Sequence, residues 1–240
     1  MRAKDKRLHI LLKVLRIGST ALAHWLTLHN FLRIFVDTDI SNYYKMVGFK
    51  YKKSVQALNF FAQQEGGKIN KMKALKLLWL SDRAHLWKHA RPITDDTYFA
   101  MKFGPVASGS KDLIEESDFI ESQTEKDYTN KYLKRLDNLQ YSSTGEIDDS
   151  VLSRSEIEAL TIVYGEFGKM SQFDLSDLSH IFPEWKKYES EIKAGGVRYE
   201  MKLVDFFDAP LKDFNVFKKL SENAKLAKEI FIQNASISNF

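Results

Sequence analysis

The chain of 240 residues is 44% hydrophobic and 13% aromatic, so it has enough apolar material for a large core and is not a disordered chain. The absence of cysteine excludes disulfide bonds and thiolate metal sites, and it agrees with a cytoplasmic location. Residues 1–45 contain eight Lys/Arg and three Asp/Glu, a net charge of +5, so the rest of the chain carries −1 of the formal total of +4 and lacks the basic excess of nucleic-acid-binding domains.

Residues 1–45 are expected to form a basic, amphipathic extension. Basic residues precede an apolar stretch, as in a signal sequence or membrane anchor, but that stretch is interrupted by Lys13, Arg16, His24 and Arg33. No uncharged apolar run of about 18 residues remains, so we expect no membrane span. Leucines at helical spacing favour a pair of surface helices that dock on the domain or on a partner. An equal alternative is that Met46 is the natural start of translation.

We expect a single domain over residues 46–240, because no internal repeat or low-complexity tract divides it. Its first helix carries Val55, Leu58 and Phe61 on one face and ends at a Gly-Gly pair. Asn70 can cap a second helix that continues to Arg91-Pro92. The run Leu77–Leu80 makes this second helix apolar almost all the way round, which predicts that it is central and buried.

A short strand is predicted after Pro92, where TYFAM alternates and is rich in β-prone aromatic residues. Because Pro105 cannot donate a backbone hydrogen bond, we expect strand pairing to stop at Gly104-Pro105. Phe103 and Val106 would then pack on either side of this corner, against the central helix. Ser108 or Ser110 is expected to cap a short helix that follows.

The stretch from about residue 119 to 149 is ambiguous, since its tyrosines and leucines fit a helix while its polar composition suits a ribbon or loop. Three more helices follow. The first opens with a capping box at Ser153–Glu156, the next with Ser171 and Asp174, and the third has Pro183 as its first residue and runs to Gly195-Gly196. A last long helix extends from Phe214 to about Ile232. The sequence therefore predicts a mainly α fold, a single compact helical domain with a small β element around residues 97–106, preceded by the helical extension.

No catalytic, cofactor-binding or metal-binding residue is assigned from these patterns. His85 and His89 stand four apart on the second helix with Asp82 nearby, a spacing that metal ligands use, but the glutamate of metalloproteases is absent after the first His. A solvated or partner-facing helix is the better interpretation. His180 could add a ligand, yet a His at a helix end more often serves as a C-cap. There is no Gly-rich phosphate loop and no G-x-S-x-G, so we do not expect an enzyme.

Four lysines near the start of the second helix (Lys68, Lys71, Lys73 and Lys76) could follow a phosphate backbone. The stripe is short, because the position one turn before Lys73 is the apolar Ile69. A solvated helix entry whose lysine stems cover apolar surface is the simpler interpretation. Nucleic acid is therefore not expected as a partner.

The ordered motifs of this chain resemble the Panacea domain, the SocA-like antitoxin domain also found in phage-associated proteins. The first half of the resemblance is the segment KINKMKALKLLWLSDRAHLWKHARPITDDTYFAMKFGPVASG, and the second half comprises LSRSEIEAL and LSDLSHIFPEW. The positions that match, called the motif residues below, are Lys76, Leu77, Trp79, His85, Pro92, Phe103, Gly104, Pro105, Val106, His180 and Trp185. Trp79 stands where the family pattern often has Tyr. The similarity runs from about Phe49 to about Glu200, and the extension has no counterpart in it.

This resemblance implies an antitoxin that neutralises a cognate toxin by direct binding. In the family, one mode is simple occlusion of the toxin and another is delivery of the bound toxin to an AAA+ protease. The motif residues are expected to be mostly structural, with some contact to the partner. Trp87, Tyr188 and Phe240 are candidate exposed anchors for that partner. The alternatives are a DNA-binding transcriptional regulator and a metal-dependent enzyme centred on His85 and His89.

Overall fold

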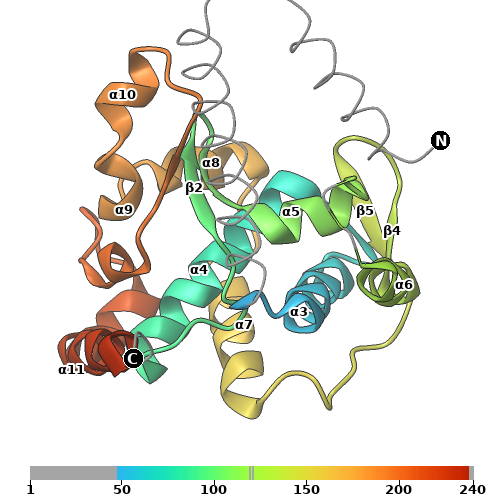
Figure 1. The fold of residues 1–240 in the computed structure, drawn as a ribbon, viewed down its shortest axis with the longest axis horizontal. Helices are drawn as coiled ribbons and strands as arrows, with labels where there is room; N and C mark the ends of the chain where they lie inside the picture. Colours follow the sequence, from blue (N-terminus) through green and yellow to red (C-terminus); the bar gives the residue numbers. More distant parts are fainter. Residues whose placement is uncertain (1–47, 119, 121, 238–240) are drawn as a thin grey trace, which may run out of the picture. The chain divides into compact units, whose positions relative to one another are not determined.

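The structure is a computed structural model that describes residues 48–118, 120 and 122–237 (Figure 1). The expectations for residues 1–45 and for Phe240 lie outside the described residues. The helices are α3 Tyr51–Gln64, α4 Lys71–His89, α5 Ser108–Glu115, α6 Gln123–Tyr132, α7 Arg154–Phe167, α8 Gln172–Ser179, α9 Pro183–Lys186, α10 Glu189–Lys193, the 3-10 helix η1 Leu203–Phe207 and α11 Asn215–Ile237. The strands are β1 Lys68–Asn70, β2 Tyr98–Met101, β3 Gly104–Ala107, β4 Leu133–Arg135, β5 Gln140–Ser143 and β6 Arg198–Glu200.

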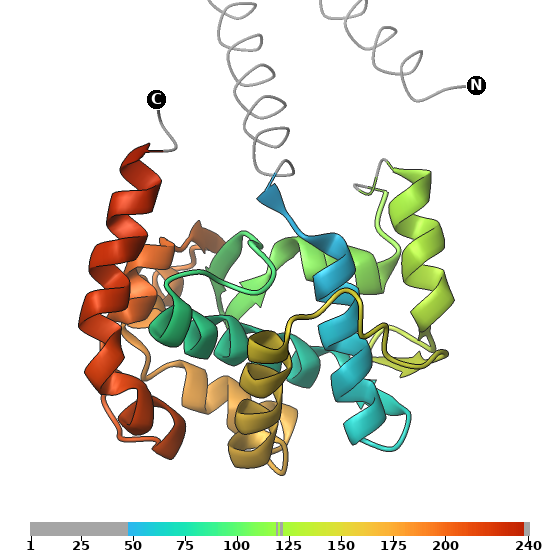
Figure 2. The same ribbon diagram turned by 90° about the horizontal axis from the view of Figure 1, so that it is seen from below.

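Helix α4 is the centre of the domain, as its apolar sequence predicts. It packs against α3, α7, α8 and α11, and Figure 2 shows it between α11 on one side and α3 on the other. The four residues Leu77–Leu80 are wholly buried. Asn70 caps the helix, since its side chain accepts hydrogen bonds from the backbone N–H groups of Met72 and Lys73, and Ala90 ends it in the left-handed conformation.

One small antiparallel sheet has the strand order β1-β5-β4 and covers part of α3. Its strands are only three or four residues long, and two of them come from the stretch that the sequence left ambiguous. Tyr141 lies in the middle strand, is fully buried and donates a hydrogen bond from its hydroxyl to the carbonyl of Leu58 at 2.9 Å. The ambiguous stretch thus contains both a helix, α6, and a ribbon, β4 and β5.

The second sheet has the order β3-β2-β6 and contains the predicted strand element. The expectation that pairing stops at Gly104-Pro105 is wrong: β2 and β3 form a hairpin in which Ala100 pairs with Pro105 and Met101 with Gly104. Pro105 is tolerated because β3 is an edge strand, where a residue without an N–H can face away from its neighbour. The chain turns instead at Lys102-Phe103, between the two strands.

Helix α5 begins differently from the prediction, because neither Ser108 nor Ser110 is its N-cap residue. The N-cap is Ala107, which has no side-chain acceptor. The buried carboxylate of Asp96 takes that role and accepts hydrogen bonds from the backbone N–H groups of Gly109 and Ser110, both at 2.8 Å. The cap of α5 therefore also fixes the loop before β2.

The later helices follow the predicted starts. Both capping boxes are present, at Ser153 with Glu156 and at Ser171 with Asp174, and Pro183 occupies the first turn of α9. The helix predicted from Pro183 to Gly195 is instead divided at Tyr188 into α9 and α10. The mainly α fold with small antiparallel sheets is thus confirmed. Among the described residues, no helix has the length and apolar content needed to cross a membrane.

Candidate functional site

The motif residues of α4 lie inside the domain and link α4 to the elements around it. Leu77 and Trp79 are fully buried, and the Trp79 ring meets Phe182 edge-on at 4.7 Å between centroids. The Lys76 ammonium is also buried and donates a hydrogen bond to the carbonyl of Pro105 at 2.6 Å. Burial lowers the pKa of Lys76 well below its usual value. Lys76 therefore anchors β3 to α4 and is not a surface cation.

Gly104 is required at the point where β3 meets α4 and α8. Its φ of +93° is in the region that favours glycine. A Cβ atom at this position would lie 1.9 Å from Ser179 Oγ and 2.7 Å from Lys76 Nζ. Pro92 and Pro105 are buried and Val106 is half-buried, whereas Phe103 at the hairpin turn is 58% exposed. The prediction that Phe103 packs against the central helix is therefore wrong for its side chain.

Asp82 joins α4 to the turn that follows Pro92. Its buried carboxylate accepts hydrogen bonds from the backbone N–H groups of Ile93 and Thr94, from the Thr94 hydroxyl and from the Tyr98 hydroxyl. Burial raises the pKa of Asp82 to about 6, although these hydrogen bonds favour the ionised form. Asp82 is therefore a structural acceptor with no free oxygen for a metal.

Arg83 and Glu184 form a wholly buried ion pair between α4 and α9. The guanidinium Nη1 lies 2.6 Å from each carboxylate oxygen, and Nη2 donates to the carbonyl of Asp208. The guanidinium carbon lies 4.9 to 5.2 Å from the ring centroids of Trp87, Phe182 and Phe217. Two charges in a core need such partners to offset the loss of hydration.

His85 uses both ring nitrogens within the fold. Nδ1 lies 2.7 Å from the carbonyl of Arg91, which can only accept, so Nδ1 carries the proton and Nε2 accepts from the Ser155 hydroxyl at 3.2 Å. Burial lowers the pKa of His85 to about 4. The expectation of a solvated His85 is wrong, although His89, whose ring centroid lies 4.6 Å away, is exposed. No group of three His, Asp or Glu side chains that could hold a metal occurs in the described parts of the chain.

Glu156 connects α7 to α3 and to the Arg91 turn. Its buried carboxylate accepts from Lys53 Nζ at 2.6 Å, from Arg91 Nη1 at 2.8 Å and from the backbone N–H of Ser153 at 2.8 Å. Burial alone would raise the pKa of Glu156, but the hydrogen bonds from Lys53 and Arg91 outweigh it and lower that pKa to about 2. The capping box was predicted from the sequence, whereas these two cations were not.

The motif residues His180 and Trp185 close the far side of the β2–β3 hairpin. His180 is the C-cap residue of α8, as predicted, and its ring stacks on Trp185 with centroids 3.9 Å apart. Trp185 Nε1 donates to the carbonyl of Met101 at 2.9 Å. Burial lowers the pKa of His180. These two residues therefore hold the end of β2 in place.

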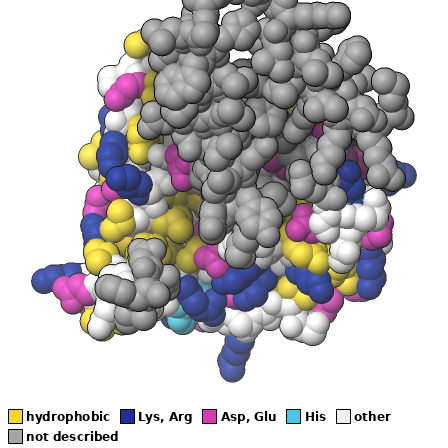
Figure 3. Space-filling view, in the orientation of Figure 1, with side chains coloured by type: hydrophobic (Ala, Val, Ile, Leu, Met, Phe, Trp, Pro, Cys, Tyr) yellow, Lys and Arg dark blue, Asp and Glu magenta, His cyan; other side chains and the backbone are white. Residues whose placement is uncertain are grey.

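The lysine stripe considered for nucleic acid is not a continuous solvated face. Lys76 is in the core, Lys73 pairs with Glu65 at 2.7 Å, and Lys71 pairs with Glu115. Only Lys68 of the four is exposed and without an ion pair among the described residues. Figure 3 shows Lys/Arg and Asp/Glu side chains interspersed on the described part of the visible face. This arrangement gives no large field of one sign for a phosphate backbone.

Two of the aromatic anchors proposed from the sequence are not free surface residues. Trp87 is buried and its Nε1 donates to the carbonyl of Phe206 at 2.7 Å. Tyr188 is half-buried, stacks on Tyr199 and donates its hydroxyl to the carbonyl of Glu200. Among the described residues, the large hydrophobic side chains that are exposed are Phe103, Leu136, Leu139, Phe173, Val197, Leu211, Leu226, Ile230 and Ile232. The periodicity of the sequence does not show which hydrophobic side chains the tertiary structure buries, so it did not distinguish the buried Trp87 from the exposed residues.

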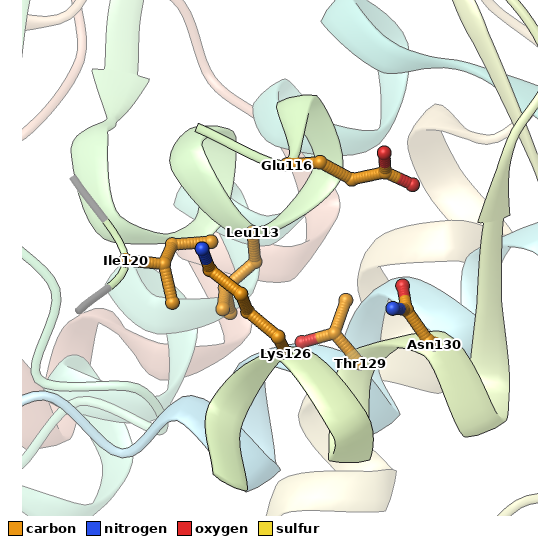
Figure 4. Close-up of a pocket in the computed structure, with 6 residues that line it drawn as sticks. All are labelled: Leu113, Glu116, Ile120, Lys126, Thr129 and Asn130. Carbon is orange, nitrogen blue, oxygen red and sulfur yellow. The ribbon is translucent and has the colours of Figure 1, made fainter. Parts of the chain in front are cut away.

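Two cavities in the described part of the chain are small. One of about 250 Å³ lies between α5 and α6 and is lined by Leu113, Glu116, Ile120, Lys126, Thr129 and Asn130 (Figure 4). Figure 4 shows the Thr129 hydroxyl pointing towards the Lys126 stem, and this hydroxyl has no hydrogen-bond partner in the described structure. Another cavity of about 310 Å³ lies between β1, β5 and the start of α8. Both are at or below the small end of the range of ligand pockets, about 300 to 1,000 Å³.

Residues 75–186 match the family model described as the antitoxin SocA-like, Panacea domain. This match confirms the resemblance predicted from the sequence and supports an antitoxin-type role for the chain. It extends from α4 to α9 and so includes every motif residue. No curated protein and no solved structure matches the chain.

Proposed function

We propose that this protein, in which residues 75–186 match the antitoxin SocA-like Panacea domain, is the antitoxin of a toxin–antitoxin pair and neutralises its cognate toxin by direct binding. The observation that carries the proposal is the family match over the central helix and the hairpin. The contacts of Lys76, His85 and Arg83 agree with it. These charged or polar side chains bind other parts of the fold, so recognition of a partner is left to the surface of the domain.

The protein would act as a binder and not as an enzyme. Lys76, Asp82, Arg83, His85 and Glu156 are all engaged with other parts of the fold, and none of them lines either cavity described above. A catalytic group must reach a substrate, so these residues are poor candidates for catalysis. The same contacts disfavour a metal-dependent enzyme centred on His85 and His89.

Binding would occur in the cytoplasm, and it would have one of two consequences for the toxin. The bound toxin is either occluded or delivered to an AAA+ protease, as in the two modes that the resemblance implies. These modes differ in the lifetime of the toxin. After synthesis is stopped, occlusion lengthens the half-life of the toxin in cells that contain the antitoxin, whereas delivery shortens it in a manner that requires the protease.

Co-expression tests the proposal. The product of the adjacent gene is induced alone or together with this chain, and growth and recovery of a complex are measured. We expect that product to arrest growth alone, and we expect growth and a stable complex when both are present. A harmless product, or arrest that persists with no recoverable complex, would reject the antitoxin function. Binding of operator DNA in place of the toxin, with a steep dependence on salt, would favour the transcriptional regulator.

A further inference from the structure

Three exposed hydrophobic side chains lie near α8 and the larger of the two cavities described above. They are Phe173 on α8, 64% exposed, Leu139 in the β4–β5 turn, 66% exposed, and Phe103 in the β2–β3 turn, 58% exposed. These residues, together with the cavity of about 310 Å³, are called the Phe173 surface below. Exposed apolar side chains that are bordered by polar residues are typical of protein–protein interfaces.

Contacts in the fold place these residues on one surface. The cavity is lined by Gln172, which precedes Phe173, and by Gln140, which follows Leu139. Ser176 lies one turn after Phe173 on α8, and its hydroxyl donates a hydrogen bond to the carbonyl of Phe103 at 3.1 Å. Phe173 is thus the middle member of the group, with the recess and Leu139 on one side and Phe103 on the other.

The backbone under each of the three side chains is fixed. Phe173 lies in the first turn of α8, which the Ser171–Asp174 capping box closes. The carbonyl of Leu139 accepts from the backbone N–H of Lys71 at 2.7 Å, and Phe103 occupies the turn of a paired hairpin. A surface that is already ordered loses little conformational entropy when a partner binds.

The recess has a basic outer edge. Lys68 and Lys134 both pair in register with Ser142, one from each side, so they share the outer face of the β1-β5-β4 sheet. Both are exposed and neither has an ion pair within the described residues, and Lys68 lines the recess. The other charged residues that line it, Glu65 and Lys73, neutralise each other at 2.7 Å.

Acidic groups also lie near this surface, but none among the described residues forms an ion pair with Lys68. Asp137 lies beside Leu139 and accepts hydrogen bonds from the backbone N–H groups of Leu139 and Gln140. Asp174 is held by Ser171, whose hydroxyl donates to it at 2.8 Å, and Asp177 is exposed one turn further along α8. Lys102, beside Phe103, adds another cation without an ion pair among the described residues, and its ammonium lies 5.7 Å from the Phe103 ring centroid. The partner that complements this surface is a protein with apolar sockets and at least one carboxylate.

We propose that the Phe173 surface is the toxin-binding face, on which Phe173 and Phe103 enter apolar sockets of the cognate toxin and Lys68 receives an acidic side chain of that toxin. This inference rests on the antitoxin function proposed above. A second copy of this chain and a nucleic acid are the competing occupants, and the experiment below separates both from the toxin.

The test compares variants of the full chain in complex with the co-expressed product of the adjacent gene. Phe173→Ala and Lys68→Glu change the proposed face. Leu226→Ala and Lys219→Glu are matched controls on α11, where Leu226 is 61% exposed and Lys219 is exposed without an ion pair among the described residues. All four side chains are exposed, so thermal unfolding should show that each variant folds like the wild type.

We expect Phe173→Ala and Lys68→Glu each to weaken toxin affinity by roughly tenfold or more, and the controls to change it by less than about twofold. Raising the salt concentration should weaken the wild-type complex more than the Lys68→Glu complex. Wild-type affinity in both folded variants would overturn the toxin-binding face while leaving the antitoxin function intact. A dimer of this chain that Phe173→Ala dissociates, or DNA binding that Lys68→Glu abolishes, with toxin affinity unchanged, would also overturn it. Failure of the wild type to bind the toxin would instead reject the antitoxin function.

Discussion

Arg83 and Glu184 form an ion pair that is closed to solvent on both sides, with the guanidinium Nη1 2.6 Å from both carboxylate oxygens. Burial raises the pKa of Glu184 and lowers the pKa of Arg83, and the attraction between the two groups opposes both shifts. The pair fastens α9 to α4, on the side where Asp208 and α11 also pack. The stability of this core depends on both residues, because either charge alone would be buried without a compensating partner.

Removing one member of this pair should be severely destabilising. Glu184→Ala leaves the Arg83 guanidinium buried and unpaired, and we expect it to lower the free energy of unfolding by about 3–5 kcal/mol. Lys88→Ala, which breaks the exposed pair with Glu158, serves as the control and should cost much less. Urea denaturation followed by circular dichroism measures both. Equal losses of unfolding free energy in the two variants would show that the buried ion pair does not stabilise the fold more than an exposed one.

Gly104→Ala should destabilise the protein for two separate reasons. Its φ of +93° disfavours any side chain, and the new Cβ would overlap Ser179 Oγ. Gly195, with φ of +104° and no atom within 4 Å of an added Cβ, is the matched control for the backbone cost alone. We expect Gly104→Ala to lower the midpoint of thermal unfolding clearly more than Gly195→Ala.

The Ser179→Ala background separates these two costs further. Removing the hydroxyl relieves the closest of the overlaps, so Gly104→Ala should cost less in that background than in the wild type. An identical cost in both backgrounds would mean that close packing on α8 does not explain the glycine.

His85 should make stability depend on pH in a defined direction. Burial lowers the pKa of His85 to about 4 in the folded state, whereas an unfolded histidine titrates near 6.5. Between these values the unfolded chain binds a proton that the folded chain does not. The contribution of His85 to the free energy of unfolding is therefore complete above about pH 6.5 and is lost as the pH falls towards 4. Buried Asp82 and Asp96, whose pKa values burial raises to about 6, act in the opposite direction over an overlapping range.

A variant comparison isolates the contribution of His85 from that of the two aspartates. In His85→Asn the amide keeps a donor near the Arg91 carbonyl but cannot titrate. On going from pH 7 to pH 4.5, we expect the wild type to lose about 1–3 kcal/mol more unfolding free energy than His85→Asn. A parallel pH dependence of the two proteins would contradict a buried neutral imidazole.

Trp185 should stabilise the domain without taking part in toxin binding. Trp185→Phe removes the hydrogen bond from Nε1 to the carbonyl of Met101 but keeps an aromatic ring against His180. We expect the free energy of unfolding to fall by about 1–2 kcal/mol, mainly because the partly buried carbonyl of Met101 loses its donor. Toxin affinity, measured well below the unfolding temperature, should stay within about twofold of the wild type. A tenfold loss of affinity in the folded variant would assign Trp185 to the interface.

The helices were predictable where a local signal marks their ends. Asn70, Ser153 and Ser171 cap the helices that follow them because each side chain accepts from a backbone N–H two or three residues further along the chain. The strands of the first sheet were not predictable, since three or four residues contain no clear period. Lys68 and Ser142 meet only through the tertiary fold.

The same distinction applies to the candidate site. The apolar run of α4 predicted a central helix, but the sequence alone does not tell that Lys76 and Arg83 point into the core while Lys88 stays exposed. Charged residues in a helix that is apolar almost all the way round indicate that these side chains are buried with polar partners. Asp82 and Arg83 are such residues in the sequence of α4. The exposure of Phe103 and Phe173 could not be predicted, because only the packed structure distinguishes these exposed rings from the many buried aromatic side chains.

Titration of the purified full chain with the purified product of the adjacent gene, in an isothermal calorimeter at physiological salt, measures toxin binding directly. The expected result is a saturable complex of fixed stoichiometry whose affinity is at least tenfold weaker for Phe173→Ala and unchanged for Leu226→Ala. A titration with no heat of binding, supported by two separate peaks in gel filtration, would contradict it.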